Sequence, residues 1–253
     1  MSLIEPQWLA PKSVHTRVST RLGGVSQAPY HSLNLGDHVG DRFEDVLANR
    51  TIFTKEMPGE PIWLTQTHQT KVSTPQSRDP NQGMPIEADA SVTNTPQEVL
   101  VIMTADCLPV LFTNSNGTAV GAAHAGWRGL CAGILENTIT ELLKISGGST
   151  AGDLMAWLGP AIGPESFEVG KDVVKSFQDS GFSVPKNAFT EISCKPGKFL
   201  ADIYLLARAR LEACGVKMIF GGEYCTVRDQ HQFFSYRRDG ETGRFASAIW
   251  IEK

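Results

Sequence analysis

Two β-rich runs on either side of the turn sequence Asn114-Ser115-Asn116-Gly117 constrain the fold of this chain more than any other feature. The runs cover residues 109–113 and 118–123, and an Asn-Gly turn between such runs is typical of an antiparallel hairpin. If residues 114–117 form a four-residue loop, Cys107 faces His124 across the hairpin, with Cβ atoms about 4.5–5.5 Å apart. If Asn116-Gly117 forms a two-residue turn instead, the register shifts by two residues. Both registers stay open at this point.

Strands and helices alternate along the rest of the chain without a regular βαβ rhythm. The predicted strands cover residues 14–18, 98–104, 154–158, 216–220, 233–236 and 245–251, and the predicted helices cover residues 41–57, 127–145, 166–180 and 201–214. Asp41 is the expected cap of the first helix. The turn-rich stretch 73–87 is expected to be a surface loop. We therefore predict a single α+β domain over residues 1–253.

The composition excludes several classes of protein. With 41% hydrophobic and 20% charged residues the chain is typical of an ordinary globular protein. Its net charge of −4 argues against a nucleic-acid-binding protein, which usually carries a basic stripe. No apolar stretch reaches the roughly 18 residues of a membrane span, and the first residues lack the features of a signal peptide. Five scattered cysteines without a CxxC pair indicate reduced thiols and a cytoplasmic location. We expect a monomer or a small homo-oligomer.

Cys107 and His124 are the first candidates for chemistry. A thiolate and an imidazole at hairpin distance can share a metal ion, or act as a nucleophile and its base. The alternative is a buried structural cysteine beside a hydrogen-bonded core histidine. Asp106 favours a site, because a carboxylate at the end of an apolar strand is costly unless it is used. His68 would supply a third ligand, although nothing in its spacing links it to the other two.

The segment after His124 has the character of an anion site. Its small residues, in Ala125-Gly126-Trp127-Arg128-Gly129, lead into a predicted helix. Such a turn presents free backbone N–H groups at the positive end of the helix dipole, and Arg128 would add a positive charge.

Seven short motifs follow one another between about residue 5 and residue 252. They are Thr20-Arg21-Leu22-Gly23-Gly24-Val25-Ser26, Ser32-Leu33-Asn34-Leu35-Gly36, Gln66-Thr67-His68, Ala88-Asp89-Ala90-Ser91, Thr104-Ala105-Asp106-Cys107-Leu108-Pro109, His124-Ala125-Gly126-Trp127-Arg128-Gly129 and Ser235-Tyr236-Arg237-Arg238. Together they resemble the YfiH-type family, whose members carry the names laccase-domain protein, polyphenol oxidase and purine nucleoside phosphorylase. Gln69 departs from the family pattern, because many relatives have glycine there.

The resemblance implies a fold, a cofactor and an activity. The implied fold is a two-layer β core flanked by helices, shared with the catalytic domain of cytotoxic necrotizing factor. His68, Cys107 and His124 would hold one zinc ion and leave a fourth position open. The activity would be phosphorolysis of adenosine, inosine, guanosine and methylthioadenosine, together with deamination of adenosine, so the partners would be purine nucleosides and phosphate. The residues expected to bind substrate or phosphate are Arg21, Gly23, Gly24, Asn34, Arg128 and Arg237, and the expected catalytic residues are Asp106, Cys107 and His124.

Two other activities stay open. A laccase needs about ten histidines, largely in His-x-His pairs. This chain has six histidines and no such pair, so it cannot build a four-copper centre. One copper ion could replace zinc at the three-ligand site and oxidise phenols weakly. The other activity is that of a hydrolase that edits cell-wall precursors, through zinc or through Cys107 as nucleophile and His124 as base. Either Asp106 or Asp89 would then orient the base.

Overall fold

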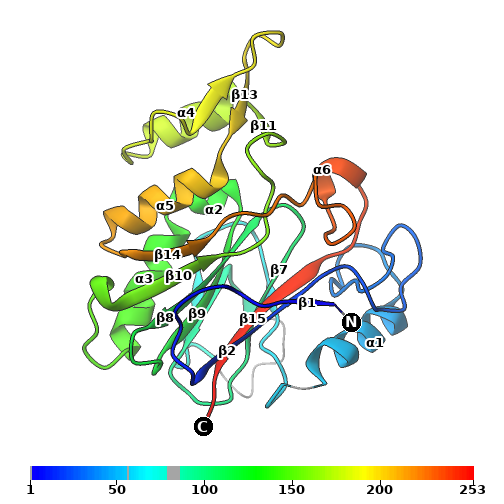
Figure 1. The fold of residues 1–253 in the computed structure, drawn as a ribbon, viewed down its shortest axis with the longest axis vertical. Helices are drawn as coiled ribbons and strands as arrows, with labels where there is room; N and C mark the ends of the chain where they lie inside the picture. Colours follow the sequence, from blue (N-terminus) through cyan, green and yellow to red (C-terminus); the bar gives the residue numbers. More distant parts are fainter. Residues whose placement is uncertain (1, 56, 79–85) are drawn as a thin grey trace.

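The computed structural model describes residues 2–55, 57–78 and 86–253, and two β-sheets lie face to face at its centre (Figure 1). The first sheet is antiparallel, with the strand order β1 (Leu3–Ile4), β2 (Val14–Ser19), β15 (Phe245–Ile251) and β7 (Leu100–Thr104). The second is mixed, with the order β14 (Met218–Gly221), β10 (Leu154–Leu158), β8 (Leu108–Asn114), β9 (Val120–Ala125), β6 (Ala90–Thr93) and β4 (Val72–Ser73).

Smaller sheets and helices surround this core. The small sheets pair β3 (Leu64–Thr65) with β5 (Ile86–Glu87), and order β11 (Glu168–Gly170), β13 (Lys198–Ala201) and β12 (Phe189–Glu191). The helices are α1 (Phe43–Thr54), α2 (Trp127–Ala132), α3 (Ile134–Ile145), α4 (Lys171–Asp179), α5 (Ile203–Ala213) and α6 (Tyr236–Asp239), with a 3₁₀ turn at Ala151–Asp153. In the described part of the chain, none of these helices has the length and apolar character that crossing a membrane requires.

Apolar side chains fill the space between the two large sheets. Ile102 and Ile249 of the first sheet and Leu111 and Trp157 of the second are fully buried in one cluster. Helices α3 and α5 pack on the outer face of the second sheet, while Phe53 of α1 packs against the outer face of the first (Figure 1). The predicted α+β class is therefore confirmed, with two β layers between helices. The likeness to cytotoxic necrotizing factor stays a prediction.

The hairpin of β8 and β9 forms, but not in the register that pairs Cys107 with His124. Pro109 faces His124, so of the two registers left open the structure has the one shifted by two residues, and the direct cross-strand pair expected for the other register does not form. The side chain of Asn114 sets this register. Its Oδ1 accepts hydrogen bonds from the N–H groups of Thr118 (2.8 Å) and Ala119 (3.1 Å). Asn114 thus belongs to β8, and the loop covers residues 115–118.

Several predicted helices begin or end elsewhere. The helix predicted over residues 127–145 is broken into α2 and α3 at Gly133, whose φ of 100° lies in the left-handed region that favours glycine. The stretch 166–180 begins as β11 and becomes helical only in α4. Asp41 does not cap α1, because its Oδ2 accepts hydrogen bonds from Ser26 Oγ (2.6 Å) and Asn34 Nδ2 (2.9 Å).

The strand predicted over residues 233–236 is wrong. Phe233 and Phe234 are fully buried in a loop, and the side chain of Ser235 caps α6 by accepting a hydrogen bond from Arg238 N. The other predicted strands are confirmed as β2, β7, β10, β14 and β15, and the helix at 201–214 as α5. The predicted surface loop at 73–87 contains residues of β4 and β5 at its ends, while residues 79–85 lie outside the described residues.

Candidate metal centre

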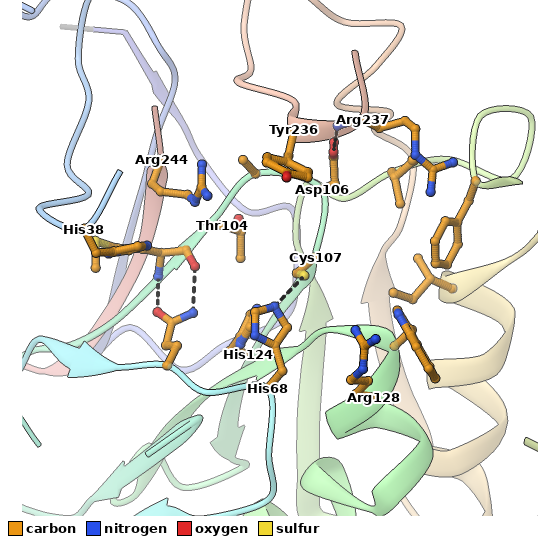
Figure 2. A pocket seen from close by; sticks show the side chains of 17 residues that line it. His38, His68, Thr104, Asp106, Cys107, His124, Arg128, Tyr236, Arg237 and Arg244 are labelled. Carbon is orange, nitrogen blue, oxygen red and sulfur yellow. Dashed lines mark hydrogen bonds between the residues drawn. The ribbon is translucent and has the colours of Figure 1, made fainter. Parts of the chain in front are cut away.

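A cavity of about 470 Å³ opens where β7 ends and β9 leads into α2 (Figure 2). Three of its lining residues bring their metal-binding atoms close together. His68 lies in the bend after β3, Cys107 in the turn between β7 and β8, and His124 in β9. One donor atom from each lies within 4.8 Å of the other two. Cys107 Sγ is 3.7 Å from His68 Nε2, and the centroids of the two imidazole rings are 4.7 Å apart.

Asp89, which is fully buried, holds two of these residues in place. Its Oδ1 accepts hydrogen bonds from His124 Nδ1 (2.8 Å) and from the backbone N–H of His68 (2.9 Å). Its Oδ2 accepts from the N–H groups of Thr67 (3.1 Å) and Gln69 (2.8 Å). Burial alone would raise the pKa of Asp89, but the hydrogen bonds from His124 and from the backbone outweigh it and lower the pKa to about 2. Asp89 is therefore a carboxylate that fixes both the bend carrying His68 and the ring of His124.

The charges of the site favour a thiolate at Cys107. Burial raises the pKa of the thiol, yet the charge of His124 and hydrogen bonds from His124 and His68 outweigh this and lower it to about 6. Burial likewise opposes protonation of His124, but Cys107 and Asp89 raise its pKa to about 9. The thiolate is the form of cysteine that binds metals, so the electrostatics and the geometry agree.

The donor set fits a tetrahedral metal ion of the zinc type. Zinc binds thiolate at about 2.3 Å and imidazole at about 2.0–2.1 Å, which brings its ligand atoms to about 3.3–3.7 Å from one another. Cys107 and His68 already have this spacing. Three protein ligands leave one position for a substrate or water, as in catalytic zinc sites. Within the described ranges this is the one group of three or more such residues placed to hold an ion.

Gly126 lies against all three ligands, and its lack of a side chain lets them approach one another. A Cβ at this position would lie 2.9 Å from His68 Cδ2 and 3.0 Å from Cys107 Sγ. The backbone dihedral angles of Gly126 (φ −61°, ψ 155°) are ones that any residue adopts. A larger residue is therefore disfavoured only by the close contacts of its Cβ with the metal ligands. We expect Gly126→Ala to weaken metal binding by about 10- to 100-fold, because ligands must be held within about 0.5 Å.

Competition with a chromogenic chelator measures this effect. Gly152→Ala is the matched control, because a Cβ there meets its nearest neighbour at 3.7 Å. Equal metal affinity of Gly126→Ala and the wild type would contradict the close-packing argument.

Four of the residues predicted to bind substrate do not line the cavity. Arg21 donates hydrogen bonds to the carbonyl oxygen of His31, and the N–H groups of Gly23 and Gly24 donate to Ser32 Oγ (3.1 and 3.2 Å). Asn34 is fully buried and bonds within the protein. Their contacts lie within the protein, and their role in binding substrate stays a prediction.

Asp106, Arg128 and Arg237 do line the cavity. The Asp106 carboxylate accepts hydrogen bonds from Arg237 N (2.6 Å) and Thr226 Oγ1 (2.5 Å), so it holds the start of α6 (Figure 2). Arg128 is exposed, and its guanidinium carbon lies 4.4 Å from the centroid of Trp127. The guanidinium of Arg237 donates to the carbonyl of Glu168 (3.0 Å).

The sequence assigned no role to several other lining residues, among them Gln66, Thr104, Tyr236 and Arg244. Gln66 lies in the motif that precedes His68, so a signal existed. Its side-chain amide donates to the carbonyl of Met103 (2.8 Å) and accepts from the N–H of the same residue (2.9 Å), which ties the end of β7 to the bend that carries His68. Arg244 lies in no motif, and only the folded structure brings it to the site.

Proteins similar to this chain along nearly its whole length carry two different kinds of name. The family model described as "Multi-copper polyphenol oxidoreductase laccase" matches residues 15–252. A purine nucleoside phosphorylase of Haemophilus influenzae is 48% identical over 254 residues and the full length of both chains. The purine nucleoside phosphorylase YfiH of Escherichia coli is 49% identical over 98% of each chain. The fold is similar to a crystal structure from Neisseria meningitidis, with a TM-score of 0.90 and 46% sequence identity over 99% of each chain. It is also similar to YlmD of Geobacillus stearothermophilus, with a TM-score of 0.86 and 30% sequence identity over 96% of this chain and 93% of YlmD. The chain therefore belongs to the YfiH family, which the family model describes as a polyphenol oxidoreductase laccase.

Proposed function

We propose that this protein is a zinc-dependent purine nucleoside phosphorylase that also deaminates adenosine. The convergence of His68, Cys107 and His124 on a cavity of about 470 Å³ carries the proposal, since this volume suits a small molecule. The names of the relatives from Haemophilus influenzae and Escherichia coli support the same reaction.

The side chains around the cavity have distinct tasks in this reaction. Asp89 takes the hydrogen bond of His124 Nδ1, which leaves Nε2 of that ring to face Cys107 and the ligand position. Trp127, Ile162 and Phe167 offer apolar and aromatic surface to a purine ring and exclude water from it. Zinc at the three-ligand site would supply Lewis-acid catalysis at its open position. In phosphorolysis the C1′–N9 bond breaks with its electron pair leaving on the base, while an oxygen of phosphate bonds to C1′.

Product analysis with defined metal content tests the proposal. Protein with about one zinc ion per chain is expected to convert inosine and phosphate to hypoxanthine and ribose 1-phosphate, and to convert adenosine to inosine. Removal of the metal by a chelator should abolish both reactions, and zinc should restore them. Metal-loaded protein that releases no base from inosine in phosphate would refute the phosphorylase proposal.

A cysteine hydrolase is the second candidate, and one observation favours it. The three side chains of a nucleophile, a base and an orienting carboxylate lie in contact, in the order Cys107, His124 and Asp89. The orienting carboxylate is Asp89 and not Asp106, which bonds to Arg237 N instead. Metal-free protein separates the two proposals. A thiol nucleophile would hydrolyse amides without metal and would be inactivated by iodoacetamide, whereas the zinc enzyme has no activity to inactivate under these conditions.

A laccase is not supported, despite the description of the family model. Of the other histidines, His15 stacks on Trp250 and His38 lies at the cavity beside Asp37. Within the described part of the chain no second group of ligands accompanies the first, so a trinuclear copper cluster lacks its residues.

A further inference from the structure

Arg244 enters the wall of the cavity in a fixed conformation. Its backbone N–H donates a hydrogen bond to Asn34 Oδ1 (2.8 Å), and its Nη1 donates to the carbonyl oxygens of Thr242 (2.9 Å) and Gly243 (3.0 Å). The backbone of Gly36 packs against its aliphatic stem, because a Cβ on that glycine would lie 2.8 Å from Arg244 Cγ. The motif Ser32-Leu33-Asn34-Leu35-Gly36 therefore acts on the site indirectly, by holding this arginine.

The positive charge of Arg244 has no ion-pair partner among the described residues. The side chain is half-buried, and among the described residues no carboxylate forms an ion pair with it. Its Nε and Nη2 donors make no hydrogen bond within the described chain. Burial lowers the pKa of Arg244, and the nearby charges of Cys107 and Asp106 oppose this. A half-buried guanidinium with two free donors can bind an anion through a charged hydrogen-bond pair.

Thr104 adds a second unused polar group beside Arg244. In the first sheet Thr104 of β7 pairs with Phe245 of β15, the residue directly after Arg244. Its Oγ1 is buried and has no hydrogen-bond partner among the described residues, and Thr104 lines the same cavity. A hydroxyl and a guanidinium fork at one sheet edge are the donors that an oxyanion needs.

The other two arginines of the cavity are less suited to bind an anion. Arg128 is exposed and stacks on Trp127, and the guanidinium of Arg237 donates to the carbonyl oxygens of Ser166 and Glu168. In Figure 2 Arg244 and Thr104 lie on the opposite side of His68 and Cys107 from Arg128. One end of the cavity is therefore polar and positively charged, with Arg244 and Thr104. At the other end Arg128 stacks on the ring of Trp127.

We propose that Arg244 and the Thr104 hydroxyl form the subsite for inorganic phosphate, a role that rests on the proposed phosphorylase function. The phosphate oxygen that bonds to C1′ is held at this end, and the nucleoside occupies the end with Trp127. Asn34 is a positioning residue that acts through Arg244.

Arg244→Gln tests the proposal in zinc-loaded protein. Loss of a charged bidentate contact is expected to raise the KM for phosphate by about 10- to 100-fold, with the KM for inosine within about 2-fold of wild type. Adenosine deamination, which uses no phosphate, should be retained. Isothermal titration with inorganic phosphate should show the same loss of affinity without any turnover. Arg42→Gln is the matched control, because this arginine directly precedes α1 and its side chain is 72% exposed.

The outcomes separate the subsite from the function. Wild-type protein without phosphorolysis would refute the function, while binding of phosphate that depends on Arg244 would still support the subsite. An unchanged phosphate affinity and KM in Arg244→Gln would overturn the subsite, as would a loss in Arg128→Gln alone. Binding of adenosine monophosphate through Arg244 without binding of free phosphate would assign the subsite to a 5′-phosphate and overturn the proposal for inorganic phosphate. Equal circular dichroism and zinc content of the variants verify that they are folded.

Discussion

Replacing Cys107 by serine is expected to remove the bound metal and to lower kcat/KM for nucleoside phosphorolysis by at least about 1000-fold. The thiolate is the one anionic donor of the three ligands, and serine is nearly the same size but is not ionised at neutral pH. Cys107 lies in a turn rather than in the core between the sheets, so the fold should survive the change. Elemental analysis after gel filtration and steady-state kinetics measure the two effects.

Cys194→Ser is the control for this variant, since Cys194 is an exposed thiol. It should keep the metal and the activity of the wild type. A Cys107→Ser protein that retains one zinc ion per chain would show that the ligand assignment is wrong. A variant that loses activity but keeps its metal would instead favour the cysteine hydrolase.

Asp89→Asn is expected to reduce both the stability of the fold and the affinity for metal. The carboxylate of Asp89 accepts hydrogen bonds from His124 and from three backbone N–H groups. In the variant, the NH₂ group of the asparagine would face some of these N–H donors and could not accept their hydrogen bonds. Breaking such a buried charged network costs about 3 kcal/mol of unfolding free energy. Loss of a carboxylate that orients a histidine ligand weakens metal binding by about 10- to 100-fold. Urea unfolding and chelator competition give the two values.

Asp179→Asn is the control, because its carboxylate pairs with Lys175 at the surface and is 63% exposed. Such a pair contributes little, so the free energy of unfolding should change by less than about 0.5 kcal/mol. An Asp89→Asn protein as stable as this control would contradict the assigned network.

The pKa of Asp89 also predicts how stability depends on pH. Because the folded protein lowers this pKa to about 2 from the usual value near 4, the carboxylate stabilises the fold fully above about pH 4. This contribution is lost as the pH falls from about 4 to 2. Urea unfolding between these pH values should therefore show a steeper loss for the wild type than for Asp89→Asn.

The pattern of apolar residues along the sequence predicted those strands and helices whose formation depends mainly on residues close together in the chain. Alternating or continuous apolar runs located β2, β10 and β15, because strand residues that face a packed layer must be apolar. The sequence left two hairpin registers open, since the choice between them depends on one side chain, Asn114, that bonds to backbone N–H groups across the loop. The aromatic run at Phe233 and Phe234 reads as a strand, but these rings fill a gap beside Phe245 from a loop.

The site was predictable only in part, for a related reason. His68, Cys107 and His124 lie in short motifs and converge, although the spacing between them carries no information about this. Arg21 and Asn34 also lie in motifs, yet their side chains bond to the protein itself. Arg244 reaches the cavity because Asn34, more than 200 residues earlier in the chain, holds it there. A contact of this range leaves no trace in the pattern of neighbouring residues.

The origin of the three metal ligands in separate segments determines when the ion enters the protein. The bend after β3, the turn after β7 and the end of β9 belong to three different sheets and meet only when these sheets have packed together, so an unfolded chain offers no local pair of ligands. We therefore expect the metal to bind after the chain has folded, and its identity to depend on which ions the surroundings supply. We expect protein produced in copper-rich culture to carry copper in the same position. Any oxidase activity of such a preparation would then come from the copper supplied by the medium.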